Sequence, residues 1–478
     1  MSGKDVIAML PIMVPAYGGA LLMLVVAFVQ SAKLAHWFTI FSFAAAFVSL
    51  FVAGACAPRT VASQLAVDSY SLIFSGIILA AAFAVTLLSG DYLRAHEKNG
   101  QAFYVLLAFA VTGMLVVASS AHFLSFFLGL ETLSVSLYGL IGYTRGQSKS
   151  LEAAMKYLIM AAVSSAVLLF GIALIYTDAG TMDFARLIAA MPGLGAVSLF
   201  GLGLVMVGFG FKLAWAPFHT WSPDVYQGAP APVTALIATG SKGAVFALVL
   251  RLMVAAGLPD HRVVFTALAV LAVATMTVGN LLALTQRNVK RLLAYSSVAQ
   301  MGYLFIPLLS AGAEGVSSAI FYLVSYMAAA VAAFGVIAAV SAHRSTGDVE
   351  DIADYAGLAS RRPVLAGVLA ISMLSLIGMP LTSGFFAKFY IFSAAAQAGL
   401  WWLLIVGVVN TGLSAFYYLR VVFALYTTPT VVGAEDAPVP LVGPAIALGL
   451  SAAVMIFAGI YPSPLVRLAE VAARSLRF

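Results

Sequence analysis

The sequence predicts an all-α polytopic membrane protein with about fourteen transmembrane helices, and two observations predict this class. First, the 478 residues are 63% hydrophobic and only 9% charged, with a mean hydropathy of +1.05. Soluble domains average about 45–50% apolar and about 25% charged residues, so lipid is needed to cover this surface. Second, the apolar residues form continuous runs of the ~20 residues that cross a bilayer as a helix. These runs lack the period-2 alternation of a membrane β-barrel.

Fourteen such runs follow one another along the chain, and together they predict one integral membrane domain over residues 1–478. They cover residues 10–29, 35–56, 70–89, 103–119, 122–143, 154–176, 196–224, 231–257, 264–284, 293–310, 316–341, 364–396, 401–426 and 441–461. The first run is longer than the ~7–15-residue apolar core of a signal peptide and lacks a small-x-small cleavage pattern. We therefore expect it to remain as the first span.

The distribution of lysine and arginine predicts the orientation. Loops that follow odd-numbered spans hold twelve of these cations, whereas the other loops and both termini hold seven. Positive residues concentrate in cytoplasmic loops. The bias therefore predicts that the odd loops are cytoplasmic and that both termini lie outside.

Redox cofactors bound by this chain itself are not expected. Cys56 is the single cysteine, and one thiol cannot build a disulfide, an iron–sulfur cluster or a thiolate metal site within the chain. Four of the six histidines fall in or beside predicted loops, which leaves His122 and His219 and argues against bis-histidine haems. No dinucleotide-binding or phosphate-binding glycine motif follows a predicted strand.

Charges inside the predicted spans give the strongest indication of function. The residues concerned are Glu131, Lys156, Lys212, Lys242, Arg251 and Lys388. Each intramembrane charge costs roughly 3 kcal/mol even on the mildest scale, so each is a functional hypothesis by default.

Some of these charges also have a structural interpretation. Arg251, near the end of its span, is expected to extend its head group to the outer interface. Lys156 lies one turn inside its span and could do the same on the cytoplasmic side, so both interpretations stay open. His122 begins a span and fits an interface residue. Lys242 lies in the middle of its span, too deep to reach water easily.

Lys212 and Lys388 lie beside interruptions of their spans. Lys212 precedes Pro217, which cannot donate a helical hydrogen bond, and Lys388 follows a segment interrupted by Gly378 and Pro380. Broken helices at membrane depth are tolerated only inside protein or beside water, and a pair of them in corresponding halves of a chain indicates inverted repeats and a transport path. We expect the breaks to admit water and the lysines to hold protons there.

Two further side chains could act on the protons of these lysines. Glu131 would stay ionised beside Lys212 and would bind a proton if isolated; a purely structural ion pair is the alternative. His219 could pass protons onward because imidazole titrates near neutral pH, or it could stabilise the turn through a hydrogen bond.

Three long segments resemble signatures of the antiporter-like subunits of respiratory complex I, which are shared with Mrp-type multisubunit cation/proton antiporters. They are FKLAWAPFHTWSPDVYQGAPAPVTA, RNVKRLLAYSSVAQMGY and GMPLTSGFFAKFYIF, and the resemblance covers roughly residues 65–425. In the third segment, PLTSGF replaces the more usual PPLAGF, which leaves Gly384 and Lys388 in place.

Within this family the chain looks most like the N subunit of bacterial NADH:quinone oxidoreductase, the counterpart of mitochondrial subunit 2. The segment LGLETLSVSLYGLIGY resembles the fifth helix of that subunit. Lys388 stands where the M subunit typically has glutamate. The segment after the last span is expected to be too short for the long lateral helix of the L subunit.

The resemblance implies two inverted five-helix repeats, at residues 103–257 (spans 4–8) and 264–426 (spans 9–13), with spans 7 and 12 discontinuous. The function that it implies is proton translocation by a non-redox subunit of an enzyme complex, a translocase. The expected location is the bacterial inner membrane, and the charge distribution predicts that both termini are periplasmic. NADH, FMN, iron–sulfur clusters and quinone are expected on partner subunits, and no nucleic acid is expected to bind. The expected partners are other membrane and peripheral complex I subunits. Apart from the resemblance, the loop at residues 343–363, which is predicted to be exposed on the cytoplasmic side, is expected to offer one docking surface.

The site residues also follow from the resemblance. Glu131 is expected to pair with Lys212, Lys242 to be the central relay and Lys388 the terminal one. Lys156 corresponds to a further lysine often included in the path. The alternative function is a subunit of an Mrp-type sodium/proton antiporter. Association with NADH- and quinone-binding subunits would exclude this alternative.

Overall fold

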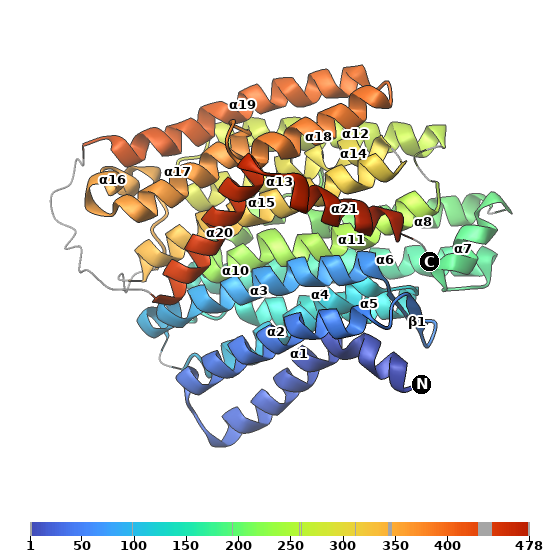
Figure 1. The fold of residues 1–478 in the computed structure, drawn as a ribbon, viewed down its shortest axis with the longest axis horizontal. Helices are drawn as coiled ribbons and strands as arrows, with labels where there is room; N and C mark the ends of the chain where they lie inside the picture. The colour runs from blue at the N-terminus through green and yellow to red at the C-terminus, as the bar shows by residue number, and fades with distance from the viewer. Residues whose placement is uncertain are drawn as a thin grey trace.

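The computed structural model describes residues 2–97, 99–193, 195–257, 259, 261–310, 312–342, 347–428 and 442–476. Over these residues the chain is almost wholly helical, and the start of α1 and the end of α21 lie toward the same end of the bundle (Figure 1). Three of the cations counted for the orientation, Lys98, Arg344 and Arg477, lie outside the described residues. Which end faces the cytoplasm stays a prediction.

The helices and strands have the following bounds: α1 Gly3–Phe28, α2 Ala32–Gly54, β1 Arg59–Val61, β2 Leu65–Val67, α3 Ser69–His96, α4 Gln101–Ser119, α5 Phe123–Ile141, α6 Ser148–Ala179, α7 Phe184–Ala190, α8 Ala196–Leu213, α9 Trp221–Gly228, α10 Ala231–Leu236, α11 Lys242–Ala255, α12 Arg262–Leu284, α13 Val289–Tyr303, α14 Phe305–Leu309, α15 Gly312–Ser341, α16 Leu358–Arg361, α17 Pro363–Ile377, α18 Ser383–Gln397, α19 Trp401–Tyr426, α20 Val442–Ile460 and α21 Ser463–Arg474.

The predicted fold class is confirmed. Thirteen helical segments among the described residues are long and apolar enough to cross a membrane. The remaining predicted span, 364–396, is divided between α17 and α18, and α17 is a shorter apolar helix. Each predicted repeat, 103–257 and 264–426, therefore contains one broken span. The inverted relation between the two repeats stays a prediction.

The first break separates α8 from α9. The backbone at Ala214 turns left-handed, with φ +56°, directly after α8 ends at Leu213. Pro217 lies three residues further on and cannot donate the backbone hydrogen bond that a continuing helix requires. The indole of Trp221, at the start of α9, donates to the carbonyl oxygen of Phe211 at 2.9 Å. This bond links the last turn of α8 to the start of α9 across the break.

The second break separates α17 from α18. Gly378 caps α17 with φ +91°, and Leu381 also has a positive φ of +70°. α18 then crosses back so close to α17 that a Cβ atom on Gly384 would overlap the carbonyl oxygen of Ser375. The two glycines thus permit a turn and a close approach that side chains would prevent.

Several elements were not predicted. An antiparallel hairpin, β1–β2, follows α2. Helix α7 lies in the loop before α8, and α21 folds back against α15 and α3. The predicted continuous span 231–257 contains a π-helical segment, Ile237–Ser241, that ends directly before Lys242. Such π segments frequently occur at functional sites.

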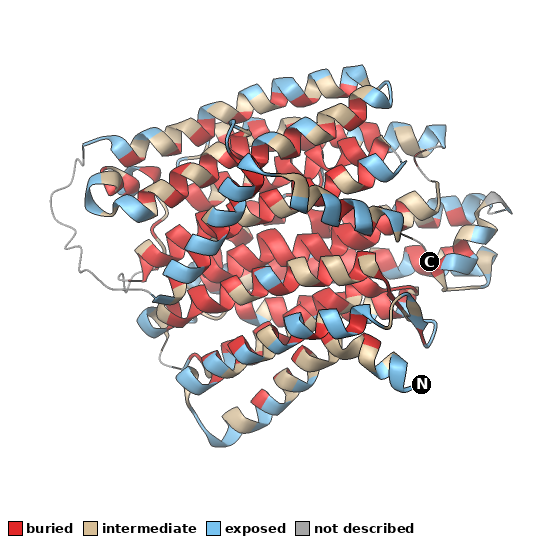
Figure 2. Cartoon of the chain, viewed as in Figure 1, coloured by how far each residue is buried: buried red, intermediate tan, exposed pale blue. Residues whose placement is uncertain are grey.

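The most deeply buried helices lie in the middle of the bundle. All of the apolar stretch within residues 231–255 is buried, compared with 28% of the stretch in α1 (Figure 2). Helices α13 and α15 are also largely buried. The interior helices α10, α11, α13 and α15 therefore form a core that the outer helices shield from lipid.

Candidate functional site

Three buried lysines with similar surroundings define the candidate site. The amine of each lysine donates a hydrogen bond to a hydroxyl group and lies within 6 Å of the centre of an aromatic ring. Among the described residues, none of the three forms an ion pair with a carboxylate. Charges held at membrane depth without a carboxylate partner are costly and are typical of proton or ion pathways.

Lys212 lies in the last turn of α8, directly before the first break. Its Nζ atom donates to Ser134 Oγ on α5 at 2.7 Å and lies 5.5 Å from the centre of the Tyr157 ring. The C-terminal end of a helix carries a partial negative charge, which favours a cation there. The break therefore places Lys212 where a proton can be held without a full counter-charge.

Lys242 begins α11, directly after the π-helical segment, and its side chain is fully buried. Its Nζ atom donates to Ser297 Oγ on α13 at 2.7 Å. The Ser297 hydroxyl is also within hydrogen-bond distance of the hydroxyls of Tyr326, at 2.6 Å, and Tyr226, at 3.2 Å. Lys242 thus connects to a chain of hydroxyl groups that reaches α15.

Lys388 lies on α18, beyond the second break. Its Nζ atom donates to the carbonyl oxygen of Ile377, the last residue of α17, at 2.9 Å, and to Thr411 Oγ1 on α19 at 3.3 Å. The same atom lies 4.7 Å from the centre of the Tyr303 ring. The break therefore supplies a carbonyl acceptor that a continuous helix would have used internally.

Glu131 is half-buried on α5 and accepts a hydrogen bond from Ser165 Oγ at 2.6 Å. No hydrogen bond or ion pair joins it to Lys212 in the described structure, so the direct pair that the resemblance implies is not formed in this conformation. Ser134, three residues after Glu131 and hence on the same side of α5, bonds Lys212 instead. The two side chains remain close enough for an electrostatic interaction.

Lys156 lies apart from the three buried lysines. Its side chain is 45% exposed and pairs with Glu152 and Asp224, each at 2.8 Å. Asp224 in turn pairs with Arg291 at 2.6 Å. The structure therefore places Lys156 in a charged network on the surface of the chain, where it also fits a structural role.

His219 is buried in the turn between α8 and α9. Its Nδ1 atom has no hydrogen-bond partner among the described residues, and the ring lies edge-on to Tyr295. His219 is close enough to Lys242 for an electrostatic interaction. His219 thus lies within the first break and near Lys242.

The expectation that Arg251 reaches the outer interface is wrong. Its side chain is fully buried and pairs with Asp68 Oδ1 at 2.7 Å, over the ring of Tyr70. Asp68 also caps α3 by accepting a hydrogen bond from the backbone N–H of Ser71. The pair thus joins α11 to the start of α3. His122, by contrast, is partly exposed and caps α5, as expected for an interface residue.

The segment predicted as a docking surface, 343–363, is described from residue 347 onward and is bound to the body of the chain. Asp348 and Lys290 form a buried ion pair at 2.6 Å. Glu350 accepts hydrogen bonds from Lys149, Gln227 and Asn288. These contacts hold the segment against α6, α9 and α13.

The hydroxyl and aromatic partners of the lysines were not predicted. They include Ser134, Tyr157, Ser297, Tyr303 and Thr411. The segment AYSSVAQMGY, with its many polar residues inside a predicted span, carried a signal for two of them. Polar side chains at membrane depth generally mark interior faces of a bundle.

Comparisons with known proteins agree with this arrangement. A transmembrane family of NADH:quinone oxidoreductase and the Mrp antiporter matches residues 120–414. A chain of respiratory complex I from Thermus thermophilus, solved with bound aureothin, is 32% identical over 96% of this chain and 99% of that chain, with a TM-score of 0.81.

Two further solved structures are similar over almost their whole length. A chain of the membrane-bound sulfane sulfur reductase, an archaeal respiratory membrane complex, is 25% identical over 98% of this chain and 97% of that chain, with a TM-score of 0.86. A chain of the Mrp complex from Dietzia sp. DQ12-45-1b is 21% identical over 99% and 97%, with a TM-score of 0.85. At that identity the last comparison shows a common fold alone.

Proposed function

Because the chain belongs to the transmembrane family of NADH:quinone oxidoreductase and Mrp antiporter subunits, we propose that it translocates protons as a non-redox membrane subunit of an NADH:quinone oxidoreductase. Within that complex it corresponds to subunit N. The proposal places it in the bacterial inner membrane with both termini in the periplasm. NADH, FMN, iron–sulfur clusters and quinone then belong to partner subunits.

The observation that carries the proposal is the set of three buried lysines, Lys212, Lys242 and Lys388. Each is buried without an ion-pair partner among the described residues, and each has a hydroxyl group at its amine. Intramembrane charges are costly and are retained mainly for ion or proton pathways. Two of the lysines lie at breaks between half-helices, the arrangement that transporters use at their binding sites.

The charge of Glu131 provides a means of controlling the first lysine. A carboxylate near Lys212 favours the ammonium form, and a carboxylate further away permits the release of the proton toward Lys242. One pKa unit corresponds to about 1.4 kcal/mol, so a movement of a few Å is energetically sufficient. The bond from Ser165 to Glu131 holds the carboxylate in the position where it does not touch Lys212.

We expect Glu131→Gln to change the protonation of Lys212. The substitution removes the negative charge while it keeps the shape of the side chain, so the electrostatic environment of the Lys212 amine changes. Infrared spectroscopy of the purified complex, titrated over pH, measures this change. Glu470→Gln, which removes an exposed acid on α21, serves as the control. Identical titrations of the wild type and the Glu131 variant would show that the two groups are not coupled.

The second candidate function is a subunit of an Mrp-type sodium/proton antiporter, since the family includes both kinds of complex. The higher identity to the complex I chain, 32% against 21%, supports the first candidate. Purification of the tagged protein from gently solubilised membranes distinguishes the two. Co-purified NADH:quinone reductase activity supports complex I, whereas an inactive preparation with small hydrophobic partners and sodium-driven proton exchange supports the antiporter.

A further inference from the structure

The route from Lys242 toward Lys388 begins with hydroxyl groups. Lys242 donates to Ser297 Oγ at 2.7 Å, and Ser297 Oγ lies 2.6 Å from the hydroxyl of Tyr326 on α15. A hydroxyl group both donates and accepts, so each can receive one proton and release another. The hydrogen-bonded chain from Lys242 thus arrives at Tyr326.

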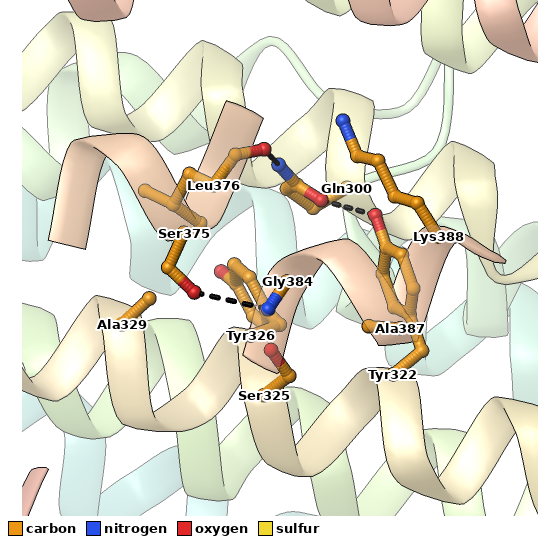
Figure 3. A pocket seen from close by; sticks show the side chains of 10 residues that line it. All are labelled: Gln300, Tyr322, Ser325, Tyr326, Ala329, Ser375, Leu376, Gly384, Ala387 and Lys388. Carbon is orange, nitrogen blue, oxygen red and sulfur yellow. Dashed lines mark hydrogen bonds between the residues drawn. The ribbon is translucent and has the colours of Figure 1, made fainter. Parts of the chain in front are cut away.

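A small cavity lies beyond Tyr326, between α13, α15, α17 and α18. It has room of about 10 Å³ for the centre of a water molecule. The residues that line it include Tyr326, Gln300, Tyr322, Ser325, Ser375 and Lys388 (Figure 3). One buried water needs roughly 10–15 Å³ measured in this way and two to four polar partners. The cavity therefore has the size and the lining for a single water molecule.

The far wall of the cavity is fixed by hydrogen bonds. Tyr322 donates to the Gln300 side chain, whose amide nitrogen donates to the carbonyl oxygen of Leu376 at 3.3 Å. The amine of Lys388 points away from Ser325 in Figure 3 and is bonded to the Ile377 carbonyl oxygen. Lys388 also lines the cavity, so we expect its amine to reach the water when it leaves that carbonyl.

We propose that this cavity, when it holds one water molecule, is the gate for proton transfer between Lys242 and Lys388, and that Tyr326 passes the proton to the water. The inference rests on the proposed function and adds to it the residues that control this proton transfer. The ammonium of Lys242 gives a proton to Ser297, which passes its own to Tyr326. Tyr326 passes its proton to the water, and the water passes one to the neutral amine of Lys388. One proton is transferred, and both hydroxyls and the water end as they began.

Two substitutions test the gate. Tyr326→Phe removes the hydroxyl and keeps the ring, and Ala329→Val fills the cavity, which Ala329 also lines. We expect each to slow proton translocation roughly tenfold or more, the scale of a lost proton-transfer group. The measurement is proton translocation by sealed vesicles that contain the native complex, in H₂O and in D₂O. Tyr326→Phe is expected to increase the solvent isotope effect, which a purely structural change would leave unaltered.

Matched controls distinguish the loss of proton transfer through the gate from damage to the fold. Tyr104→Phe removes a buried hydroxyl that contacts His36 and bonds none of the three lysines, and Ala338→Val adds the same bulk elsewhere on α15. Both are expected to pump like the wild type. Assembly is checked by the co-purification of partner subunits with each variant.

The same vesicles distinguish failure of the gate from failure of the proposed function. If Lys242→Ala stops translocation while Tyr326→Phe and Ala329→Val pump at the wild-type rate, the gate is wrong and the proposed function stands. If Lys242→Ala itself pumps normally, the proposed function is wrong. A map of the complex that resolves buried waters supports the gate if density occupies the cavity, and overturns it if waters appear elsewhere in the bundle but not there.

Discussion

Replacement of Lys242 with alanine is expected to stop proton translocation, roughly a hundredfold loss on the scale of a missing proton-transfer group, while the complex stays assembled. Lys242 is fully buried in the middle of the bundle and forms the link to Ser297. Among the described residues it has no ion-pair partner, so its removal leaves no buried countercharge exposed to an apolar environment. Assembly is measured by co-purification of partner subunits, and translocation by a pH indicator in sealed vesicles.

Two further variants make this result interpretable. Lys242→Met keeps most of the side-chain volume and is expected to behave like the alanine variant, which excludes the effect of a cavity. Lys149→Ala removes an exposed lysine that pairs with Glu350 at the surface and is expected to pump normally. Normal pumping by Lys242→Ala or by Lys242→Met would remove Lys242 from the proton path.

Arg251→Gln is expected to destabilise the protein by roughly 3–5 kcal/mol, the cost of breaking a buried ion pair by removing one partner. The guanidinium is fully buried, pairs with Asp68 at 2.7 Å and lies over Tyr70. The pair connects α11, which carries Lys242, to the first turn of α3. Thermal unfolding of the purified complex in detergent measures the loss of stability.

The control for this prediction is Arg94→Gln. Arg94 pairs with Asp91 at 3.0 Å but is largely exposed, and exposed pairs contribute little. We expect an unchanged melting temperature for this variant. Equal stability of the Arg251 variant and the wild type would show that the buried pair does not hold α3 and α11 together.

The spans could be predicted because hydropathy reports burial in lipid directly. Each of the fourteen predicted runs corresponds to a helix or to a pair of half-helices in the structure, and Pro217 and Gly378 marked the two breaks correctly. The hairpin β1–β2 and α7 were missed because they are short and lie in loops, and α21 was missed because it follows the last predicted span and is too short to be one. The π-helical segment before Lys242 leaves no hydropathy signal, since it changes the hydrogen bonding without changing the composition.

The candidate site could be predicted only in part. Buried lysines are rare enough in membrane spans to be recognised individually, which is why Lys212, Lys242 and Lys388 were found. Serines such as Ser134 and Ser297 are common in helices and often bond their own backbone, so their role as lysine partners requires the fold. Asp68 was not recognised as buried because it lies directly outside a predicted span, where the sequence resembles an ordinary loop.

The central claim is that the three buried lysines act in series. Its most direct test measures proton translocation per turnover for Lys212→Ala, Lys242→Ala and Lys388→Ala, side by side in vesicles with matched amounts of assembled complex. A series relay predicts that each single substitution lowers translocation to the same low level, because a break at any position stops the whole path. Wild-type translocation by any one of the three variants would contradict the account.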